Sequence, residues 1–260
     1  MQSSWNSFEG KTVWVTGGAG YLGSAITTAL DRVAQQVVCI DLAQKAEALV
    51  RERSLARTIP WPWDLSDAAH IETTVDQLVA SHGLPDGVAH LAYLSSAGKR
   101  LEELSPEDLT RTFSLTLTTT FLLCRALGER MKARGQGSVV LFSSMYGVVA
   151  PDPSMYPPPL VPNPIDYGAS KAAFLQMTRY FAVHYGTAGV RFNAVTPGPF
   201  PNPRLQREEP GFIARLCAKS PLNRVGQNTE IVGPTLFLLS EGASYVTGQS
   251  LVVDGGWTSW

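Results

Sequence analysis

The stretch Thr12-Val13-Trp14-Val15-Thr16-Gly17-Gly18-Ala19-Gly20-Tyr21-Leu22-Gly23 decides the fold. An apolar strand predicted at 11–16 leads directly into a glycine-rich turn, and a helical pattern follows over 21–33. A second apolar strand, 36–41, ends in the carboxylate of Asp41. Glycines allow a tight turn and let the backbone approach a pyrophosphate, which binds at the N-terminus of the next helix. This pattern predicts a βαβ unit that binds a dinucleotide.

The rest of the chain continues the alternation of strands and helices. Because the strands are continuous apolar runs, we expect a parallel sheet covered on both faces, a doubly wound α/β Rossmann fold of seven strands. No linker or repeat interrupts it, so 1–260 are expected to form one domain. The further strands are predicted at 58–65, 87–92, 137–143, 190–195 and 250–253, and the further helices at 44–55, 66–82, 105–132, 167–186 and 229–239. We expect Ser66 and Asp67 to cap the helix at 66–82, and 196–210 to be a proline-rich loop.

Composition excludes several classes of protein. The chain is 44% hydrophobic and 17% charged with a net charge of −1, and it has no run of Lys and Arg. Nucleic acid and anionic membranes are therefore not expected partners. Cys39, Cys124 and Cys217 have neither metal-ligand spacing nor a disulfide pattern, which favours a reducing cytoplasm and predicts no metal site.

Targeting signals are also missing from the pattern. The segment Met1–Gly10 lacks the basic and apolar regions of a signal peptide, and the chain has no apolar run of transmembrane length. A cytoplasmic location is the expectation.

Tyr167 and Lys171 are four residues apart. On a helix this spacing places both side chains on one face. A phenol has a pKa of about 10, and a neighbouring ammonium favours the phenolate and lowers that pKa. Tyr167 could then exchange a proton with an alcohol or a carbonyl oxygen. The spacing alone is equally typical of an ordinary surface pair.

Asp41 bears on the choice of cofactor. At the end of the second strand its carboxylate can accept hydrogen bonds from adenosine ribose hydroxyls and would repel a 2′-phosphate. Leu42 and Ala43 are not basic, and 16–23 contains no Arg or Lys. We therefore predict NAD(H) over NADP(H). The alternative is that Asp41 only caps the loop.

Taken together, the motifs resemble the short-chain dehydrogenase/reductase family over nearly the whole chain. They are Thr16–Gly23, Asp41, Asp64, Ser143–Gly147, Tyr167–Lys171, Asn193–Gly198 and Val252–Gly256. The resemblance implies that Ser144 hydrogen-bonds the substrate oxygen and that Tyr167 is the general acid/base. It implies that Lys171 binds the nicotinamide ribose and lowers the pKa of Tyr167.

The resemblance also implies a set of cofactor contacts. Asp64 and Leu65 would flank the adenine, while Pro197 and Gly198 would lie beside the nicotinamide. The full set is Gly17, Gly20, Tyr21, Leu22, Asp41, Asp64, Leu65, Ala92, Tyr167, Lys171, Pro197, Gly198 and Phe200. Asp64 as a helix cap and Ser144 as a plain strand-end serine remain alternatives.

The chain departs from the compact branch of the family in three places. The spacing of Gly17, Gly20 and Gly23 resembles the extended branch. The usual Asn-Asn-Ala-Gly after the fourth strand is replaced by His90-Leu91-Ala92-Tyr93, where His90 is expected to be a packed histidine rather than a catalytic acid. The helix Asn that completes the family's proton relay falls at Thr116, whose hydroxyl could still hold a water.

The segment Pro151–Pro164 contains seven prolines and makes the interval between Ser144 and Tyr167 longer than is usual in the family. Prolines stiffen a loop. We expect a rigid rim over the substrate pocket with Met155 and Tyr156 as possible contacts, or else a purely structural insertion. This segment resembles a subset of the family found in bacterial sugar and flagellin-glycan pathways.

These observations predict an NAD(H)-dependent oxidoreductase that interconverts a secondary alcohol and a ketone on a sugar or sugar-derived substrate. The alternatives are a lipid or steroid ketone reductase and a non-catalytic NAD-binding sensor. A nucleotide-sugar epimerase is disfavoured because too few residues follow Gly198 for a sugar-nucleotide domain. The family implies a homotetramer or homodimer. Trp257 and Trp260 are expected to be exposed in the single chain, and a C-terminal interface or a lid over a neighbouring site would bury them.

Overall fold

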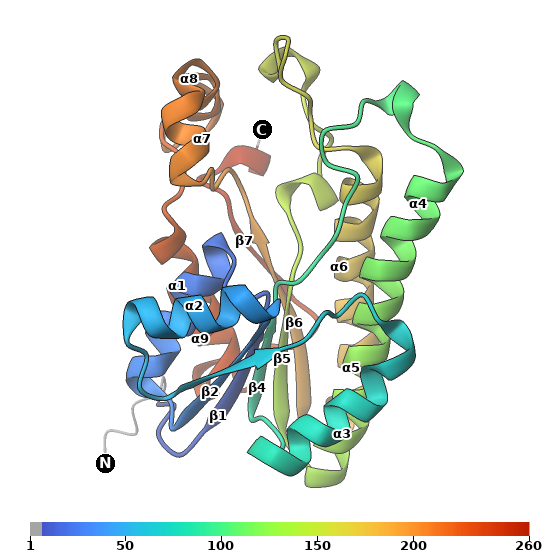
Figure 1. Ribbon diagram of the computed structural model, residues 1–260, viewed down its shortest axis with the longest axis vertical. Helices are drawn as coiled ribbons and strands as arrows, with labels where there is room; N and C mark the ends of the chain where they lie inside the picture. Colours follow the sequence, from blue (N-terminus) through green and yellow to red (C-terminus); the bar gives the residue numbers. More distant parts are fainter. Residues whose placement is uncertain (1–6, 260) are drawn as a thin grey trace.

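A seven-stranded parallel sheet forms the centre of the computed structural model, which describes residues 7–259. The strand order is β3-β2-β1-β4-β5-β6-β7, so the predicted doubly wound fold is confirmed (Figure 1). The order reverses between β1 and β4, which is where ligands bind in such sheets, at the carboxyl ends of the strands. The strands are β1 (Thr12–Thr16), β2 (Gln36–Asp41), β3 (Thr58–Pro62), β4 (Gly87–His90), β5 (Gly137–Phe142), β6 (Val190–Pro197) and β7 (Ser250–Val253).

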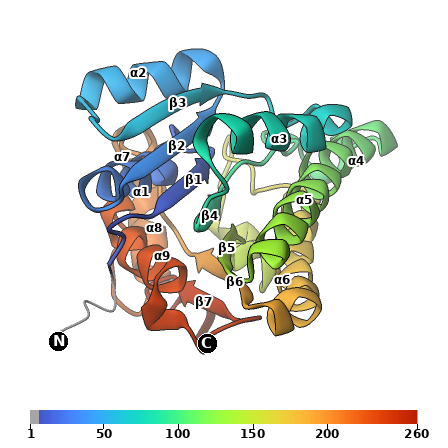
Figure 2. The same ribbon diagram turned by 90° about the horizontal axis from the view of Figure 1, so that it is seen from below.

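Helices cover both faces of the sheet (Figure 2). One face carries α1 and α9, and the other carries α3, α5 and α6, while α2 packs beside β3. The helices are α1 (Tyr21–Val33), α2 (Ala43–Arg53), α3 (Ile71–His82), α4 (Pro106–Phe113), α5 (Thr119–Arg134), α6 (Ile165–Tyr185), α7 (Pro203–Glu208), α8 (Pro210–Lys219) and α9 (Val232–Leu239).

The apolar strands supply a core on each face. In β1, Trp14 packs with the α3, α5 and α6 side, while Val13 and Val15 pack with the α1 and α9 side. Successive side chains of a strand point to opposite faces, so a strand buried on both faces must be apolar throughout. The two buried layers hold the carboxyl ends of the central strands at one edge, where the site described below lies.

The predicted helix at 105–132 is interrupted. Ser105 caps α4 as expected, and its hydroxyl accepts from the Asp108 backbone while the Asp108 carboxylate accepts from the Ser105 backbone. A π-helical turn, Ser114–Thr118, then separates α4 from α5. Such turns widen a helix locally and are frequent at functional sites.

Two other predictions of local structure were wrong. Ser66 and Asp67 do not cap a helix at 66, because the Asp67 side chain pairs with His70 and α3 begins after a short 3-10 helix. The expected loop at 196–210 contains α7, which Asn202 caps by accepting from the Leu205 backbone. Proline at the first position of α7 and α8 begins these helices, because its missing N–H has no partner to lose there.

The C-terminal prediction was also wrong in the part that the structure describes. Trp257, which was expected to be exposed, is only 4% exposed and packs against α8. Trp260 and 1–6, including most of the segment on which the signal-peptide interpretation rests, lie outside the described residues. Within 7–259 no helix has both the length and the apolar character needed to cross a membrane.

Candidate active site

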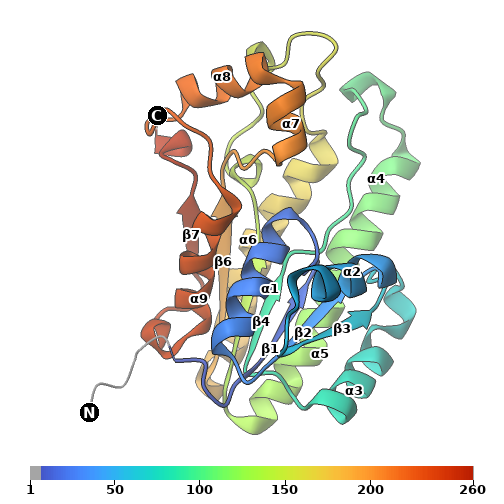
Figure 3. The same cartoon turned by 60° about the vertical axis from the view of Figure 1, so that its left-hand side comes forward.

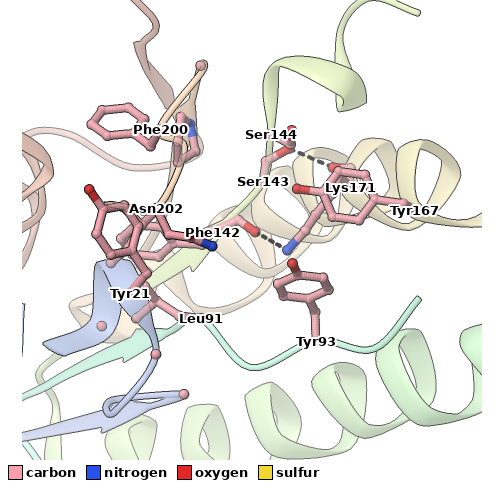
Figure 4. A pocket seen from close by; sticks show the side chains of 16 residues that line it. Tyr21, Leu91, Tyr93, Phe142, Ser143, Ser144, Tyr167, Lys171, Phe200 and Asn202 are labelled. Carbon is pink, nitrogen blue, oxygen red and sulfur yellow. Dashed lines mark hydrogen bonds between the residues drawn. The ribbon is translucent and has the colours of Figure 1, made fainter. Parts of the chain in front are cut away.

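A cavity of about 330 Å³ opens at the carboxyl ends of the central strands (Figure 4). Its walls come from the glycine-rich turn, the segments after β4, β5 and β6, and the first turns of α6. The lining includes Gly17, Gly20, Tyr21, Leu22, Ser144, Tyr167, Lys171, Pro197, Gly198 and Phe200. The fold thus brings together predicted residues from four separate stretches of sequence.

The glycine-rich turn forms a cradle that side chains would fill. Gly17 has φ +66°, and a Cβ there would lie 2.9 Å from the Ala92 backbone nitrogen. A Cβ at Gly23 would lie 2.1 Å from the Gly17 carbonyl oxygen. Helix α1 begins at Tyr21 with no side chain from the described part of the chain capping it and no acid in its first turn. An uncapped helix N-terminus above a bare backbone fits a pyrophosphate.

An adjoining hollow of about 440 Å³ extends the site past the end of β2. It is lined by Asp41, Asp64, Leu65 and Ala92, as predicted for an adenosine site. The Asp41 carboxylate accepts from the Ala19 backbone at 3.0 Å with one oxygen and from the next residue's backbone with the other. It therefore fixes the turn, and each oxygen retains a lone pair for another donor.

Asp64 also shapes its own turn. Its carboxylate accepts from the Ser66 backbone at 2.9 Å in a turn that precedes the 3-10 helix, so Asp64 is not a helix cap, and the residue lines the hollow. Lys45, in the first turn of α2, lines the same hollow and was missed by the sequence reasoning, which considered only the two residues after Asp41. In the sequence, Lys45 could have been recognised as a basic residue about one helical turn after Asp41.

Lys171 is buried in α6, with 2% of its surface exposed. Its Nζ donates to the Phe142 carbonyl at 2.8 Å and lies 4.4 Å from the centre of the Tyr93 ring. Ser143 Oγ donates in turn to the Lys171 carbonyl, so the end of β5 and helix α6 are tied in both directions. Burial lowers the pKa of Lys171 to about 7 because an ammonium loses hydration there.

Tyr167 lies on the same face of α6, and its hydroxyl is hydrogen-bonded to the Ser144 hydroxyl (Figure 4). Burial raises the pKa of Tyr167, the neighbouring Tyr93 adds to the rise, and the hydrogen bond with Ser144 opposes it. The pKa of Tyr167 is therefore raised rather than lowered as expected, because loss of hydration is the largest cause of the shift, and the Lys171 Nζ donates to the Phe142 carbonyl. The Tyr167 hydroxyl is thus held in its neutral form.

The distance between the serine and the tyrosine is set by direct backbone contact. Ser144 caps the 3-10 helix Met145–Gly147, which packs against α6. A Cβ at Gly147 would lie 2.7 Å from the Lys171 carbonyl carbon, and a Cβ at Gly168 would lie 2.9 Å from the Tyr146 carbonyl oxygen. Only glycine allows the two backbones to approach this closely.

Asp166 supports the site and was missed by the sequence reasoning. It is fully buried, and its carboxylate accepts from the Tyr167 backbone at 2.8 Å, the Ser96 backbone at 2.9 Å and the Thr112 hydroxyl at 2.6 Å. Burial by itself would raise the pKa of Asp166, but the hydrogen bonds from Thr112, Ser96 and Tyr167 outweigh it and lower the pKa. Asp166 therefore fixes the start of α6 against α4 and the segment after β4.

Thr116 does not line the cavity. It is 1% exposed in the π-helical turn, and its hydroxyl donates to the Leu94 carbonyl at 2.9 Å and accepts from the Leu94 backbone N–H at 3.0 Å. The structure thus gives Thr116 the role of holding the segment that carries Tyr93, not the relay contact that was predicted. The short side chain of Thr116 reaches only the adjacent backbone, where its hydroxyl makes both of these hydrogen bonds.

His90 is a packed histidine, as expected. It is buried between the hydroxyls of Thr16 and Thr120, at 2.7 and 2.8 Å, and burial together with the charge of Lys171 lowers its pKa to about 3. Cys39 and Cys124 are buried core residues. Across 7–259, acids, histidines and cysteines form no group of three that is arranged to hold a metal ion.

Tyr93 was not predicted as a site residue. It follows β4, lines the cavity, and its ring lies 5.4 Å from the Tyr167 ring.

Pro197 and Gly198 form another wall, where a Cβ at Gly198 would lie 2.5 Å from the Asp254 Cα. Glycine at position 198 is therefore required by its close packing against Asp254.

The fold and the site define a nicotinamide-dinucleotide oxidoreductase: a phosphate cradle and an adenosine hollow lead to a serine, a tyrosine and a lysine at the carboxyl edge of the sheet. Comparisons with known proteins agree. The family model described as enoyl-(acyl carrier protein) reductase matches residues 18–258. The chain belongs to the short-chain dehydrogenase/reductase family.

Individual relatives resemble the chain over almost all of its length. A 2,5-dichloro-2,5-cyclohexadiene-1,4-diol dehydrogenase from Sphingobium indicum is 31% identical, covering 98% of this chain and 99% of that protein. A D-threitol dehydrogenase from Mycolicibacterium smegmatis is 31% identical, covering 96% and 94%. A short-chain dehydrogenase from Leptospira borgpetersenii, solved with bound NAD+, is 29% identical with a TM-score of 0.87, covering 99% and 96%.

Proposed function

We propose that this protein is an NAD(H)-dependent dehydrogenase that interconverts a secondary alcohol and a ketone on a polyhydroxylated substrate such as a sugar, a polyol or a cyclic diol. The observation that carries the proposal is the hydrogen-bonded pair of Ser144 and Tyr167 beside the buried Lys171 at the mouth of the phosphate cradle. The substrate class rests on the relatives named above, which act on a cyclic diol and on threitol.

Each residue has a distinct task in the proposed reaction. A bound nicotinamide supplies or accepts the hydride. The hydroxyls of Ser144 and Tyr167 bind the substrate oxygen from two directions. In reduction Tyr167 donates its proton to that oxygen, and its raised pKa keeps the proton in place until the oxygen gains charge.

Oxidation reverses the proton transfer. Tyr167 must then accept the alcohol proton as negative charge develops on the phenol. Lys171 in its charged form stabilises that charge and hydrogen-bonds ribose hydroxyls, because the Phe142 carbonyl occupies only one of its three N–H donors. With a pKa of about 7, the charged form of Lys171 is favoured below neutral pH.

The preference for NAD(H) rests on the carboxylate of Asp41 in the adenosine hollow, which disfavours an added phosphate. Lys45 in the same hollow acts in the opposite direction, so the preference depends on which charge lies nearer the ribose. We further propose that the protein works as a homotetramer or homodimer, as the family resemblance implies, and that it acts in the cytoplasm, as its cysteine pattern suggests.

The test is a steady-state comparison of NADH with NADPH and of NAD-linked oxidation of D-threitol with that of a steroid alcohol. We expect a higher kcat/KM with NADH and turnover of the polyol. A higher kcat/KM with NADPH would contradict the cofactor assignment, and turnover of the steroid alone would contradict the substrate class. NADH binding without turnover of any alcohol would instead indicate the non-catalytic alternative.

A further inference from the structure

Two further phenols lie close to Tyr167. Tyr146 follows the catalytic serine by two residues, and Tyr156 comes from the proline-rich segment 151–164. Their hydroxyls are hydrogen-bonded to each other. Tyr146 is 7% exposed and belongs to an apolar cluster against which both Tyr156 and Tyr167 pack. The proline-rich segment therefore brings a second pair of hydroxyls beside the proposed acid/base.

The segment that carries Tyr156 is fastened to helix α8 (Figure 3). The Tyr156 ring lies 5.2 Å from the Phe212 ring, and Arg215 Nε donates to the Met155 carbonyl at 3.0 Å. Asp152 and Lys219 form an ion pair at 2.6 Å. The segment is thus a fixed wall, and Tyr156 has a defined position in it.

The two phenols of the pair are neutral. Burial raises the pKa of both Tyr146 and Tyr156, so the two hydroxyls stay neutral at physiological pH. Two neutral hydroxyls that bond to each other use one donor and one acceptor, which leaves one O–H and three lone pairs for another group.

We propose that the Tyr146–Tyr156 pair recognises a second hydroxyl of the substrate, on a carbon near the one that is oxidised or reduced. This deepens the proposed function and rests on it. The substrate hydroxyl accepts from the remaining phenolic O–H and can donate to a phenolic lone pair. The proline-rich segment is then a specificity-determining wall.

The expected preference for a substrate with a second hydroxyl follows from the cost of leaving the phenolic O–H without a partner. A substrate without the second hydroxyl displaces water from the pair but offers no acceptor in return, and an unpaired donor is costly. A site built to hydrogen-bond a substrate hydroxyl therefore rejects the analogue that lacks it more strongly than an apolar pocket rejects an added group.

The experiment compares cis-1,2-cyclohexanediol with cyclohexanol, which differ by one hydroxyl. With the wild-type protein and NAD we expect kcat/KM for the diol to exceed that for the monoalcohol by about 10- to 100-fold. The double variant Tyr146→Phe/Tyr156→Phe should reduce this ratio to near one. The activity with cyclohexanol should be retained, because the phenylalanines keep the ring packing.

Tyr156→Phe alone, in a surface segment, is the second variant should the double variant unfold, and it should lower the ratio in the same direction. Tyr245→Phe, at an exposed tyrosine remote from the site, is the matched control and should leave the ratio unchanged. A double variant that binds NADH and keeps the wild-type ratio would overturn the inference alone. Failure of the wild-type protein to oxidise either alcohol while binding NAD would overturn the proposed function and this inference with it.

Discussion

The adenosine end and the catalytic end of the site are built from different parts of the chain. The adenosine end is mostly backbone: a glycine turn, an uncapped helix start and a carboxylate that accepts two nearby N–H groups. The catalytic end consists of side chains from three separate segments: Tyr93 after β4, Ser144 after β5, and Tyr167 with Lys171 in α6. The first can be recognised within one stretch of sequence, whereas the second exists only after the sheet has formed.

The two ends also differ in hydration and charge. Asp41 lies beside the open hollow at the end of β2 and keeps lone pairs available. Lys171 and Tyr167 lie in surroundings that shift their pKa values in opposite directions, lowering that of the lysine and raising that of the tyrosine. Substitutions at the catalytic end should therefore change chemistry, and those at the adenosine end should change cofactor choice.

The largest effect is expected at Tyr167. Replacing Tyr167 by Phe removes the proton donor and should lower kcat by about 10²- to 10⁴-fold, the usual contribution of general acid/base catalysis. The Kd for NADH, measured by fluorescence titration, should stay within about twofold, because affinities respond to lost contacts and the ring remains. Tyr180→Phe, at an exposed tyrosine of the same helix, serves as control. Retained turnover would remove Tyr167 from the mechanism.

A smaller effect is expected at the adenosine end. Asp41→Asn removes the charge that opposes a 2′-phosphate and should shift the NADH to NADPH ratio of kcat/KM by about 10- to 100-fold toward NADPH, as for loss of a charged hydrogen-bond partner. Lys45→Ala should shift the ratio in the opposite direction. Equal loss of activity with both cofactors would show that Asp41 only holds the turn.

The backbone contact at the catalytic end can be tested with a single methyl group. Gly147→Ala places a Cβ against the Lys171 backbone, so Ser144 and Tyr167 must separate. Displacements of about 1 Å can cost up to 10²-fold in rate, and we expect a decrease in kcat of about tenfold or more. Gly186→Ala, where the added carbon meets open space, should leave kcat unchanged. An unaffected kcat in Gly147→Ala would show that the helix yields without consequence.

The smallest effect concerns stability and follows from the pKa of Lys171, which burial lowers from 10.5 to about 7. Between these values the unfolded chain holds a proton that the folded protein has released, so the lysine destabilises the fold fully below pH 7 and progressively less up to pH 10.5. Lys171→Met should raise the free energy of unfolding at pH 7 by about 1–3 kcal/mol while lowering kcat.

This gain should shrink as the pH rises from 7 toward 10, as measured by urea denaturation at several pH values. Lys132→Met, at a half-exposed lysine of α5, should show no such pH dependence. A gain in Lys171→Met that is constant over this range would contradict the lowered pKa.

Much of the fold could be predicted because its signals are local. The apolar strands and the Ser105 cap each depend on a short run of consecutive residues, and the structure confirms them. The Asp166 network could not be predicted, since Ser96 and Thr112 meet the carboxylate only through the packing of α4 against α6. The same holds for the sign of the Tyr167 pKa shift, which depends on how much water the folded site excludes.

The backbone contacts at Gly147 and Gly168 make the spacing of the serine and the tyrosine independent of the segment that lies between these two glycines. The chain leaves the site at Gly147 and returns at Gly168, and the backbones meet at these residues whatever lies between them. The intervening segment can therefore lengthen or change its sequence without altering the spacing of the serine and the tyrosine. Under the proposed function, exchanging this segment between relatives should change substrate choice and leave the serine and the tyrosine in place.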